Sequence, residues 1–561
     1  MRYIREILIK NKAVVIAYVF IGILISFITN YKINLFQKII DDFTDGTLKI
    51  TSIIIYGVIL IIFYLLNYLD EYPAKKLENG IYLDFKILSL RKISRICYRE
   101  YQSLGTGKLT QRIESGSEAG KNIIFDFWFC FIRQLLPTIL FSLLFILKIN
   151  SSIVWLMLIG YLIIFIITHL LLKSLYQIKE KILCNEEKMN HYLVRGFMEM
   201  IIFRFEKRFF SEIRKASLAR NEIVNSKVKM NLIHEAFFTI FALLVALLDI
   251  AVLVYAWYSN ELSIGETVAL ISLIENAYTP IAIFNVLFVQ YKLDKAAYKR
   301  FEKFLNLEDD LQLEQGDRVR NCRGNIVIED LNFNYENTNI FDHLNLSIKE
   351  GEKIAFVGSS GSGKTTLIKL ITGLLKYSVG SIKIDDQELD KLNLNDLYDN
   401  ISYLSQDVPV FDGTVKENIV FDKDINNTEI YEVLKKVQLY STIIDLQNKI
   451  DTIIGEKGAI LSGGERQRLA LARLWFQKSN IVILDEVSSA MDTITEELVM
   501  NEVINHLINK TVITVTHRLN LVKNFDRIIL FKDGKIVGQG TFEDLLNNNA
   551  YFIELYTANN D

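Results

Sequence analysis

Cysteine is scarce in this sequence, and the few cysteines present are not arranged to act together. The four cysteines, Cys97, Cys130, Cys184 and Cys322, lie far apart and form no CxxC pair. This spacing favours free thiols in a reducing compartment over a disulfide framework or a cysteine metal site.

An excess of positive charge is also missing, because the formal net charge is -3. A nucleic-acid-binding domain would normally be strongly basic, so nucleic acid is not an expected partner. The first apolar run is too long for a cleaved signal peptide, and no small-residue cleavage site follows it. Since this run begins at residue 13, no N-terminal peptidase domain is expected either.

What the first half of the chain does contain is six apolar stretches long enough to cross a bilayer of about 30 Å. They lie near residues 13–30, 52–69, 127–147, 153–172, 236–258 and 267–290. The long polar segments after the second and fourth stretches are rich in Lys and Arg, whereas the other loops are poor in them. We therefore expect a multi-pass protein of the cytoplasmic membrane, with its N-terminus, both long segments and its C-terminal part in the cytoplasm.

Each long polar segment can form two helical arms that reach on the order of 35 Å beyond the membrane. Gly105 and Gly107 predict a break in the first pair of arms. In the second pair, residues 196–203 are apolar although they lie far from any span. They are interpreted as an exposed docking tip; ordinary packing between the two arms is the alternative.

Four ionisable residues fall in or near the predicted spans: Arg133, His169, Asp249 and Glu275. Such residues are costly in a bilayer and are therefore candidates for the cargo pathway. The alternative is that they snorkel, sit at an interface or pair with one another. Glu275 is the residue expected on the cavity wall, and the mixed signs favour neither cationic nor anionic cargo.

The decisive motif begins at Gly358, between a predicted strand (353–357) and a predicted helix (366–375). Its residues are Gly358, Ser359, Ser360, Gly361, Ser362, Gly363, Lys364 and Thr365, with Thr366 opening the helix. In such a phosphate-binding loop, backbone N–H groups and the helix N-terminus hold phosphate oxygens. Lys364 is expected to reach the β- and γ-phosphates of ATP, and the Thr365 hydroxyl to bind Mg²⁺.

A second motif is the apolar strand at 481–484 that ends in Asp485 and Glu486. Asp485 is expected to hold Mg²⁺ through water, and Glu486 to act as the general base toward the attacking water. The fold prediction is therefore a polytopic α-helical membrane domain of six spans (1–305), a linker (306–323) and an α/β P-loop ATPase domain (324–561).

The segment 461–468, Leu-Ser-Gly-Gly-Glu-Arg-Gln-Arg, makes the ATPase domain resemble that of ATP-binding cassette (ABC) transporters. The resemblance implies that Ser462, Gly463 and Gly464 contact the γ-phosphate of ATP held by an opposite subunit. Glu465 stands where the family usually has Gln, a change expected to leave the site active and able to tune its rate.

Other residues match the family in order along the chain. The resemblance implies that Tyr335 stacks on adenine, that Gln406 senses Mg²⁺ and the attacking water, and that His517 contacts the γ-phosphate. Residues 488–492 resemble the loop that crosses to the partner, with Met491 in place of the usual Leu.

Six spans before one ATPase resemble the exporter-type half-transporter, and residues 452–458 resemble a segment typical of exporter ATPases. This implies a homodimer in which two copies share two ATP sites, with a heterodimer as the alternative. The expected activity is ATP-driven export of a lipophilic drug, lipid or peptide, with membrane lipid around the spans. A dedicated bacteriocin or peptide exporter, an uptake system on the same scaffold and an ATP-gated channel or sensor remain alternatives.

Overall fold

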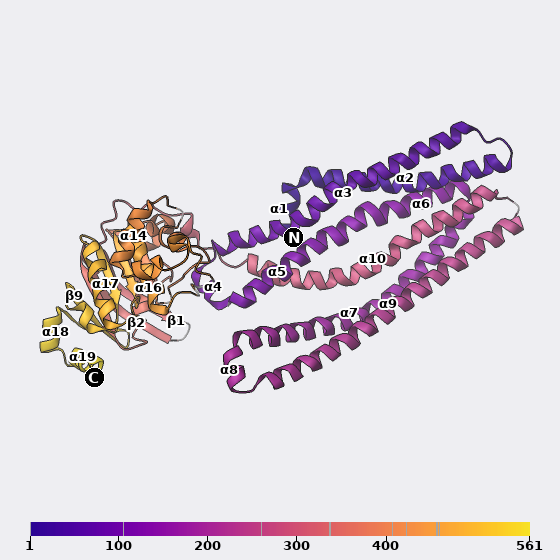
Figure 1. The fold of residues 1–561 in the computed structure, drawn as a ribbon. Coiled ribbons are helices and arrows are strands. Elements are labelled where there is room, and N and C mark those ends of the chain that lie inside the picture. Colours follow the sequence, from indigo (N-terminus) through magenta and orange to yellow (C-terminus); the bar gives the residue numbers. More distant parts are fainter. Residues whose placement is uncertain are drawn as a thin grey trace. The chain divides into compact units, whose positions relative to one another are not determined.

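The computed structural model in Figure 1 describes most of the chain as helices and two sheets. It describes residues 2–560 apart from Gly105, Asn260, Glu336, Asn337, Asp407, Asp422, Glu456, Lys457 and Ala459. The chain forms two compact units: residues 1–94 with 104–307, and residues 95–103 with 308–561. The predicted domain boundaries stay a prediction.

The first unit is entirely helical in its described part. Its elements are α1 (Arg2–Lys10), α2 (Lys12–Thr44), α3 (Ile50–Ile93), α5 (Thr106–Asn122), η1 (Ile123–Phe129), η2 (Phe131–Leu135), α6 (Leu136–Ile149), α7 (Ser151–Met198), α8 (Met200–Phe205), α9 (Phe209–Ser259) and α10 (Ile264–Leu305). Five long helical stretches are apolar enough to cross a membrane: 12–44, 50–93, 109–149, 209–259 and 264–305. The predicted fourth span lies at the start of α7, of which Ser151–Ile163 is described as a shorter apolar helix.

The third predicted span departs from regular α-helix. Two stretches, η1 and η2, are π-helices separated by Cys130. Nothing in the sequence predicted them. Such segments are rare and often lie at functional sites, because the wider turn changes which side chains face a neighbour.

The predicted arms are continuations of the helices that contain the apolar stretches. At 48 residues, α7 extends about 70 Å, and α8 then turns the chain back into α9 (Figure 1). In the first pair of arms, α3 ends at Ile93 and α4 (Tyr98–Leu104) follows. Gly105, the centre of the predicted glycine break, lies outside the described residues.

The second unit is built on two sheets. One has the strand order β2-β1-β4-β5 and is antiparallel; the other has the order β10-β9-β3-β8-β7-β6 and is parallel except at β10. The strands are β1 (Ile326–Tyr335), β2 (Thr338–Ile348), β3 (Lys353–Gly358), β4 (Val379–Ile384), β5 (Gln387–Glu388), β6 (Ile401–Leu404), β7 (Ile481–Asp485), β8 (Thr511–Val515), β9 (Arg527–Lys532) and β10 (Lys535–Gly540). Because β3, β7 and β8 are neighbours, the residues that follow them meet at one edge of the sheet.

Helices cover these sheets and form a separate helical layer between β6 and β7. They are α11 (Lys364–Ile371), α12 (Leu394–Tyr398), α13 (Val415–Val420), α14 (Asn427–Lys436), α15 (Tyr440–Ile444), α16 (Gly463–Ala472), α17 (Thr493–His506), α18 (Phe542–Asn548) and α19 (Ala550–Asn560). Leu434, Leu469 and Val499 are among the buried residues that join this layer to α17 in one core. The predicted linker is ordered: the side-chain amide of Gln312 donates to the backbone oxygens of Leu389 and Asp390.

Candidate ATP site

The phosphate-binding loop connects β3 to α11, close to the predicted positions. Gly358 has φ +153°, and a Cβ atom at this residue would lie 2.1 Å from the carbonyl oxygen of Phe531. Only glycine fits so close to the neighbouring strand. Gly363, with φ +101°, is the N-cap of α11 and turns the chain into the helix. The loop's shape therefore follows from its glycines.

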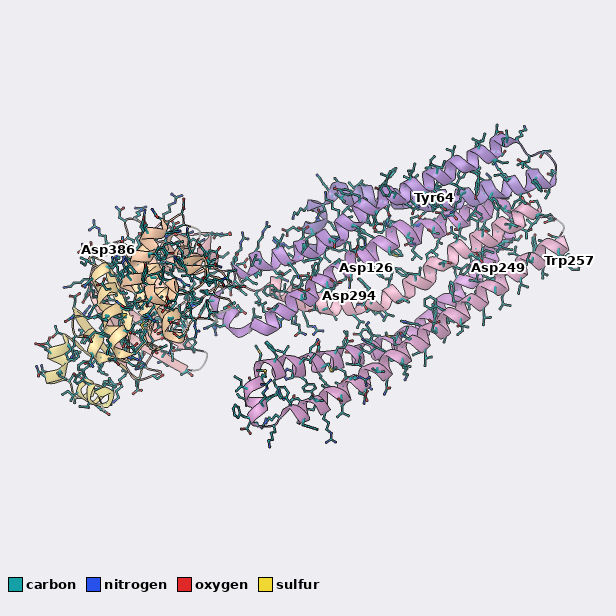
Figure 2. All side chains as sticks on the ribbon, in the orientation of Figure 1. Tyr64, Asp126, Asp249, Trp257, Asp294 and Asp386 are labelled. Carbon is teal, nitrogen blue, oxygen red and sulfur yellow. The ribbon has the colours of Figure 1, made fainter. Side chains whose placement is uncertain are left out.

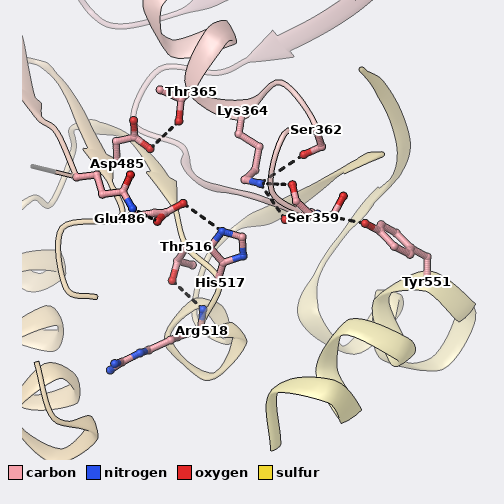
Figure 3. Close-up of polar contacts among 12 residues, drawn as sticks. Ser359, Ser362, Lys364, Thr365, Asp485, Glu486, Thr516, His517, Arg518 and Tyr551 are labelled. Carbon is pink, nitrogen blue, oxygen red and sulfur yellow. Dashed lines mark hydrogen bonds and ion pairs between the residues drawn. The ribbon is translucent and has the colours of Figure 1, made fainter. Parts of the chain in front are cut away.

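Lys364 lies at the centre of the loop (Figure 3). Its ammonium group donates to the carbonyl oxygens of Gly358 and Ser359 at 2.8 Å, and to the Ser362 hydroxyl at 3.3 Å. Burial lowers the pKa of Lys364, an effect that the charges of Glu486 and Asp485 oppose. A buried cation surrounded by loop oxygens is suited to bind a phosphate.

Thr365 and Asp485 lie next to each other, one on α11 and one at the end of β7. The Thr365 hydroxyl donates to Asp485 Oδ1 at 3.2 Å, and the Tyr403 hydroxyl lies 3.5 Å from Asp485 Oδ2. Burial raises the pKa of Asp485, which the hydrogen bond from Thr365 opposes. A hydroxyl beside a carboxylate is a donor set that suits Mg²⁺, which usually takes one or two protein oxygens together with phosphates.

Glu486 is held from two sides. Its Oε2 accepts from Gln406 Nε2 at 2.8 Å, and its Oε1 lies 3.1 Å from His517 Nε2 (Figure 3). Its backbone φ is +53°, an uncommon value for a residue other than glycine. The three residues predicted to be catalytic thus form one cluster, and their individual roles stay predictions.

The signature residues begin α16. Ser462 is its N-cap, and its hydroxyl accepts from the backbone N–H of Glu465. A Cβ atom at Gly464 would lie 2.9 Å from the Ala490 carbonyl oxygen, so glycine lets the helix approach the segment after Glu486. Ser462 is exposed at the surface of the unit. The signature therefore presents its serine outward from a rigid helix end.

Sequence reasoning missed several residues that join these parts. Gln467 Nε2 donates to the Ser489 hydroxyl at 3.1 Å, and Gln467 Oε1 accepts from the Ala490 N–H at 2.9 Å. Arg518, next to His517, donates to the Met491 carbonyl oxygen at 3.1 Å. These bonds connect the signature helix and the histidine to the predicted crossing loop, and no local pattern marks them.

Two aromatic side chains of this unit differ in what the structure shows of them. Tyr335 ends β1, is 37% exposed and packs edge-on against Phe333, which leaves its ring accessible for stacking. Tyr551 on α19, which sequence reasoning missed, accepts from the Ser359 N–H at 3.2 Å (Figure 3). Of the predicted segment 452–458, Glu456 and Lys457 lie outside the described residues.

Comparison with known proteins supports the assignment of this unit as an ATPase domain. Residues 341–489 match the family model for ABC transporters. The chain is 31% identical over 363 residues to the ABC transporter ATP-binding protein YwjA of Bacillus subtilis, covering 63% of this chain and 62% of that protein. A solved bacterial Atm1-family ABC exporter with ATP bound aligns with a TM-score of 0.81 and 19% identity, over 97% of this chain and 99% of that chain. Residues 341–489 therefore form an ABC transporter ATPase domain.

Two further relatives align with 52% and 42% of this chain. Identity is 33% over 294 residues to the ATP-dependent lipid A-core flippase of Desulfotalea psychrophila, covering 52% of this chain and 51% of the flippase. It is 39% over 238 residues to the mitochondrial iron-sulfur clusters transporter ATM1 of Debaryomyces hansenii, covering 42% of this chain and 34% of that protein. The chain thus spans less than two thirds of the length of each of these curated relatives.

In the helical unit, Arg133 is paired. It forms an ion pair with Asp70 on α3, and its guanidinium lies 3.7 Å from the centre of the Tyr18 ring. Gly22 makes room for it, because a Cβ there would lie 2.3 Å from Arg133 Nε. The pairing alternative therefore holds for Arg133, and Asp70, just beyond the second predicted span, was missed.

The other intramembrane candidates differ from Arg133. Asp249 on α9, labelled in Figure 2, and Glu275 on α10 form no ion pair within the described part of the chain, and the charge of Glu275 acts on Asp249. One carboxylate oxygen of Asp249 is buried without a hydrogen-bond partner. His169 lies on α7, but its side chain is outside the described residues. Among the four candidates, Asp249 and Glu275 are therefore the two carboxylates that have no ion-pair partner in the described part of the chain.

The apolar tip of the second pair of arms is partly as predicted. Phe197, Met198 and Ile201 are mostly exposed. Phe203 is only 6% exposed, because it packs against the ring of Phe209 at 5.6 Å. The interpretation of Phe203 as part of the exposed tip is wrong: it holds the turn together, and its neighbours form the exposed surface.

Proposed function

We propose that two copies of this chain form an exporter in the cytoplasmic membrane, driven by ATP hydrolysis at two shared sites. The observation that carries the proposal is the cluster of Glu486 between Gln406 and His517, beside Lys364 in the phosphate-binding loop. Ser462, on the separate exposed end of α16, is placed to contact a nucleotide on a second copy. A two-fold axis then makes two equivalent ATP sites.

Each residue of the cluster has one proposed role. Bound Mg²⁺, held by Thr365 and Asp485, would neutralise charge on the phosphates and orient them. Glu486 takes a proton from the attacking water, and Gln406 and His517 fix the direction of its carboxylate. Lys364 exchanges its loop carbonyl partners for phosphate oxygens, which are stronger acceptors because they are charged.

The first pair of arms gives a route by which this ATP site acts on the membrane unit. Residues 95–103 belong to the compact unit of the ATPase domain. The Lys369 ammonium lies 5.7 Å from the centre of the Tyr98 ring, and Lys369 is on α11, the helix that Lys364 begins. We infer that movement of α11 on ATP binding reaches the arm through Tyr98. ATP shifts the balance of conformations only by binding the closed pair more tightly.

The charge of the spans favours one class of cargo. Asp70 neutralises Arg133, whereas Asp249 and Glu275 remain without a cation in the described part of the chain. A lipophilic cation would offset the cost of these carboxylates in the bilayer, and an anion would increase it. We therefore propose cationic amphiphiles, small molecules or basic peptides, as the preferred cargo.

Transport by the purified chain in inside-out vesicles tests this proposal. ATP should drive a lipophilic cationic dye into vesicles that contain only this chain, while an anionic dye of similar size moves less. Movement in the opposite direction would favour the uptake alternative. Passive, ATP-gated flow that stops at equilibrium would favour the channel alternative.

A further inference from the structure

Glu465, the residue that departs from the family signature, makes an unusually complete set of contacts at the start of α16. Its Oε2 accepts from both the backbone N–H and the hydroxyl of Ser462 at 2.7 Å. Its Oε1 accepts from the Thr442 hydroxyl at 3.3 Å. The two residues form a capping box, since the Ser462 hydroxyl also accepts from the Glu465 N–H.

These contacts use up what the Ser462 hydroxyl can donate. A hydroxyl has one proton to give and two lone pairs to accept with. Here the proton points to the Glu465 carboxylate, and one lone pair accepts from the helix backbone. A phosphate oxygen can only accept a hydrogen bond. The Ser462 hydroxyl must therefore break its hydrogen bond to Glu465 before it can donate to a γ-phosphate.

The carboxylate also occupies the place that favours an anion. The N-terminus of a helix carries partial positive charge, which stabilises Glu465 and a phosphate alike. Partial burial raises the pKa of Glu465, but hydrogen bonds from Ser462 and Thr442 outweigh it, so the pKa lies below its ordinary value. Glu465 is therefore ionised near neutral pH, and a charged acceptor holds a hydrogen bond about twice as strongly as a neutral one.

We propose that Glu465 is a positioning residue that restrains ATP-driven closure. Its carboxylate accepts the hydrogen bond of the Ser462 hydroxyl and occupies the positive N-terminal end of α16. The γ-phosphate of ATP on the other copy must displace the carboxylate from both interactions. A glutamine, which is usual at this position in the family, would keep the helix cap through its neutral amide oxygen. It would compete less strongly with the γ-phosphate for the Ser462 hydroxyl. The inference rests on the proposed sharing of ATP sites between two copies, and it assigns this chain a higher ATP requirement for closure than a glutamine signature would give.

Two substitutions with opposite expected effects test it. In full-length protein in nanodiscs, a Glu486→Gln parent retains ATP without turnover, so ATP that survives rapid gel filtration reports closure. Adding Glu465→Gln should lower the half-saturating ATP concentration about fivefold, equivalent to about 1 kcal/mol. Adding Thr442→Ala should raise the half-saturating ATP concentration about twofold. Without the Thr442 hydroxyl, the Glu465 carboxylate keeps only its hydrogen bonds to Ser462 and gives them up less readily. Both should melt near the parent temperature.

The outcomes separate this inference from the proposed function. Equal half-saturating ATP in the parent and the glutamine variant would overturn the inference alone. A glutamine variant that melts well below the parent and needs more ATP would make Glu465 only a helix cap, and would also overturn it. A parent that retains no ATP at any concentration would overturn the shared ATP site and the inference together.

Discussion

Breaking the ion pair between Asp70 and Arg133 should destabilise the membrane unit strongly. The two side chains are 16% and 15% exposed, and Arg133 Nε and Asp70 Oδ1 have no hydrogen-bond partner among the described residues. Asp70→Asn removes the negative charge and leaves the guanidinium buried beside Tyr18. Removing one partner of a buried pair typically costs about 3–5 kcal/mol. For a unit of this size, that lowers the melting temperature on the order of 10 °C.

The matched control removes both charges. Asp70→Leu combined with Arg133→Met replaces the pair by apolar groups of similar volume, which is often neutral or stabilising. Thermal unfolding of the purified protein in nanodiscs, followed by intrinsic fluorescence, should rank the double variant well above Asp70→Asn. If Asp70→Asn melts like the parent protein but loses transport, Arg133 serves the cargo and the pairing is not structural.

Three further predictions follow from the site and the arms. Glu486→Gln should abolish hydrolysis yet retain bound ATP, because an amide cannot take a proton from water; ATPase activity near the parent rate would remove Glu486 from the role of base, and Gln406→Ala should reduce the rate less severely. Ile201→Asp, at the exposed arm tip, should abolish the stimulation of ATPase activity by cargo, whereas Val228→Asp, also exposed on α9 but away from the tip, should preserve it; equal stimulation in both would make the tip ordinary surface. Glu275→Gln should lower transport of a cationic dye several-fold at unchanged basal ATPase, measured in vesicles against a neutral dye, and equal loss of both would contradict a cation preference.

The positions of the candidate catalytic residues could be predicted because most of their signals are local. A strand, a glycine-rich turn and a helix in succession place Lys364 and Thr365 without any distant contact. Asp485, Glu486 and His517 each follow a buried parallel strand, and neighbouring strands bring them to one edge. Chain order was enough to bring Asp485 and Glu486 to the loop, whereas His517 was named from the resemblance to ABC ATPases.

The remaining features depend on contacts between distant residues, which leave no periodic trace. Asp70 ends an apolar stretch and looks like a boundary residue until its Arg133 partner, on a different helix, is known. Phe203 belongs to an apolar run like its exposed neighbours, and only the return of the chain at Phe209 buries it. Tyr551 reaches the phosphate-binding loop from the last helix of the chain.

Isolated mixed dimers test most directly whether two copies share their ATP sites. Parent chains and Ser462→Arg chains with different affinity tags would be co-expressed, and mixed pairs would be purified through both tags. Each mixed pair holds one intact and one disrupted composite site, because each site takes its signature serine from the other copy. If the two sites act together, the mixed pairs should hydrolyse ATP and transport dye at less than about a tenth of the parent rate. Mixed pairs with half the parent rate, or the absence of any mixed pairs, would contradict the account.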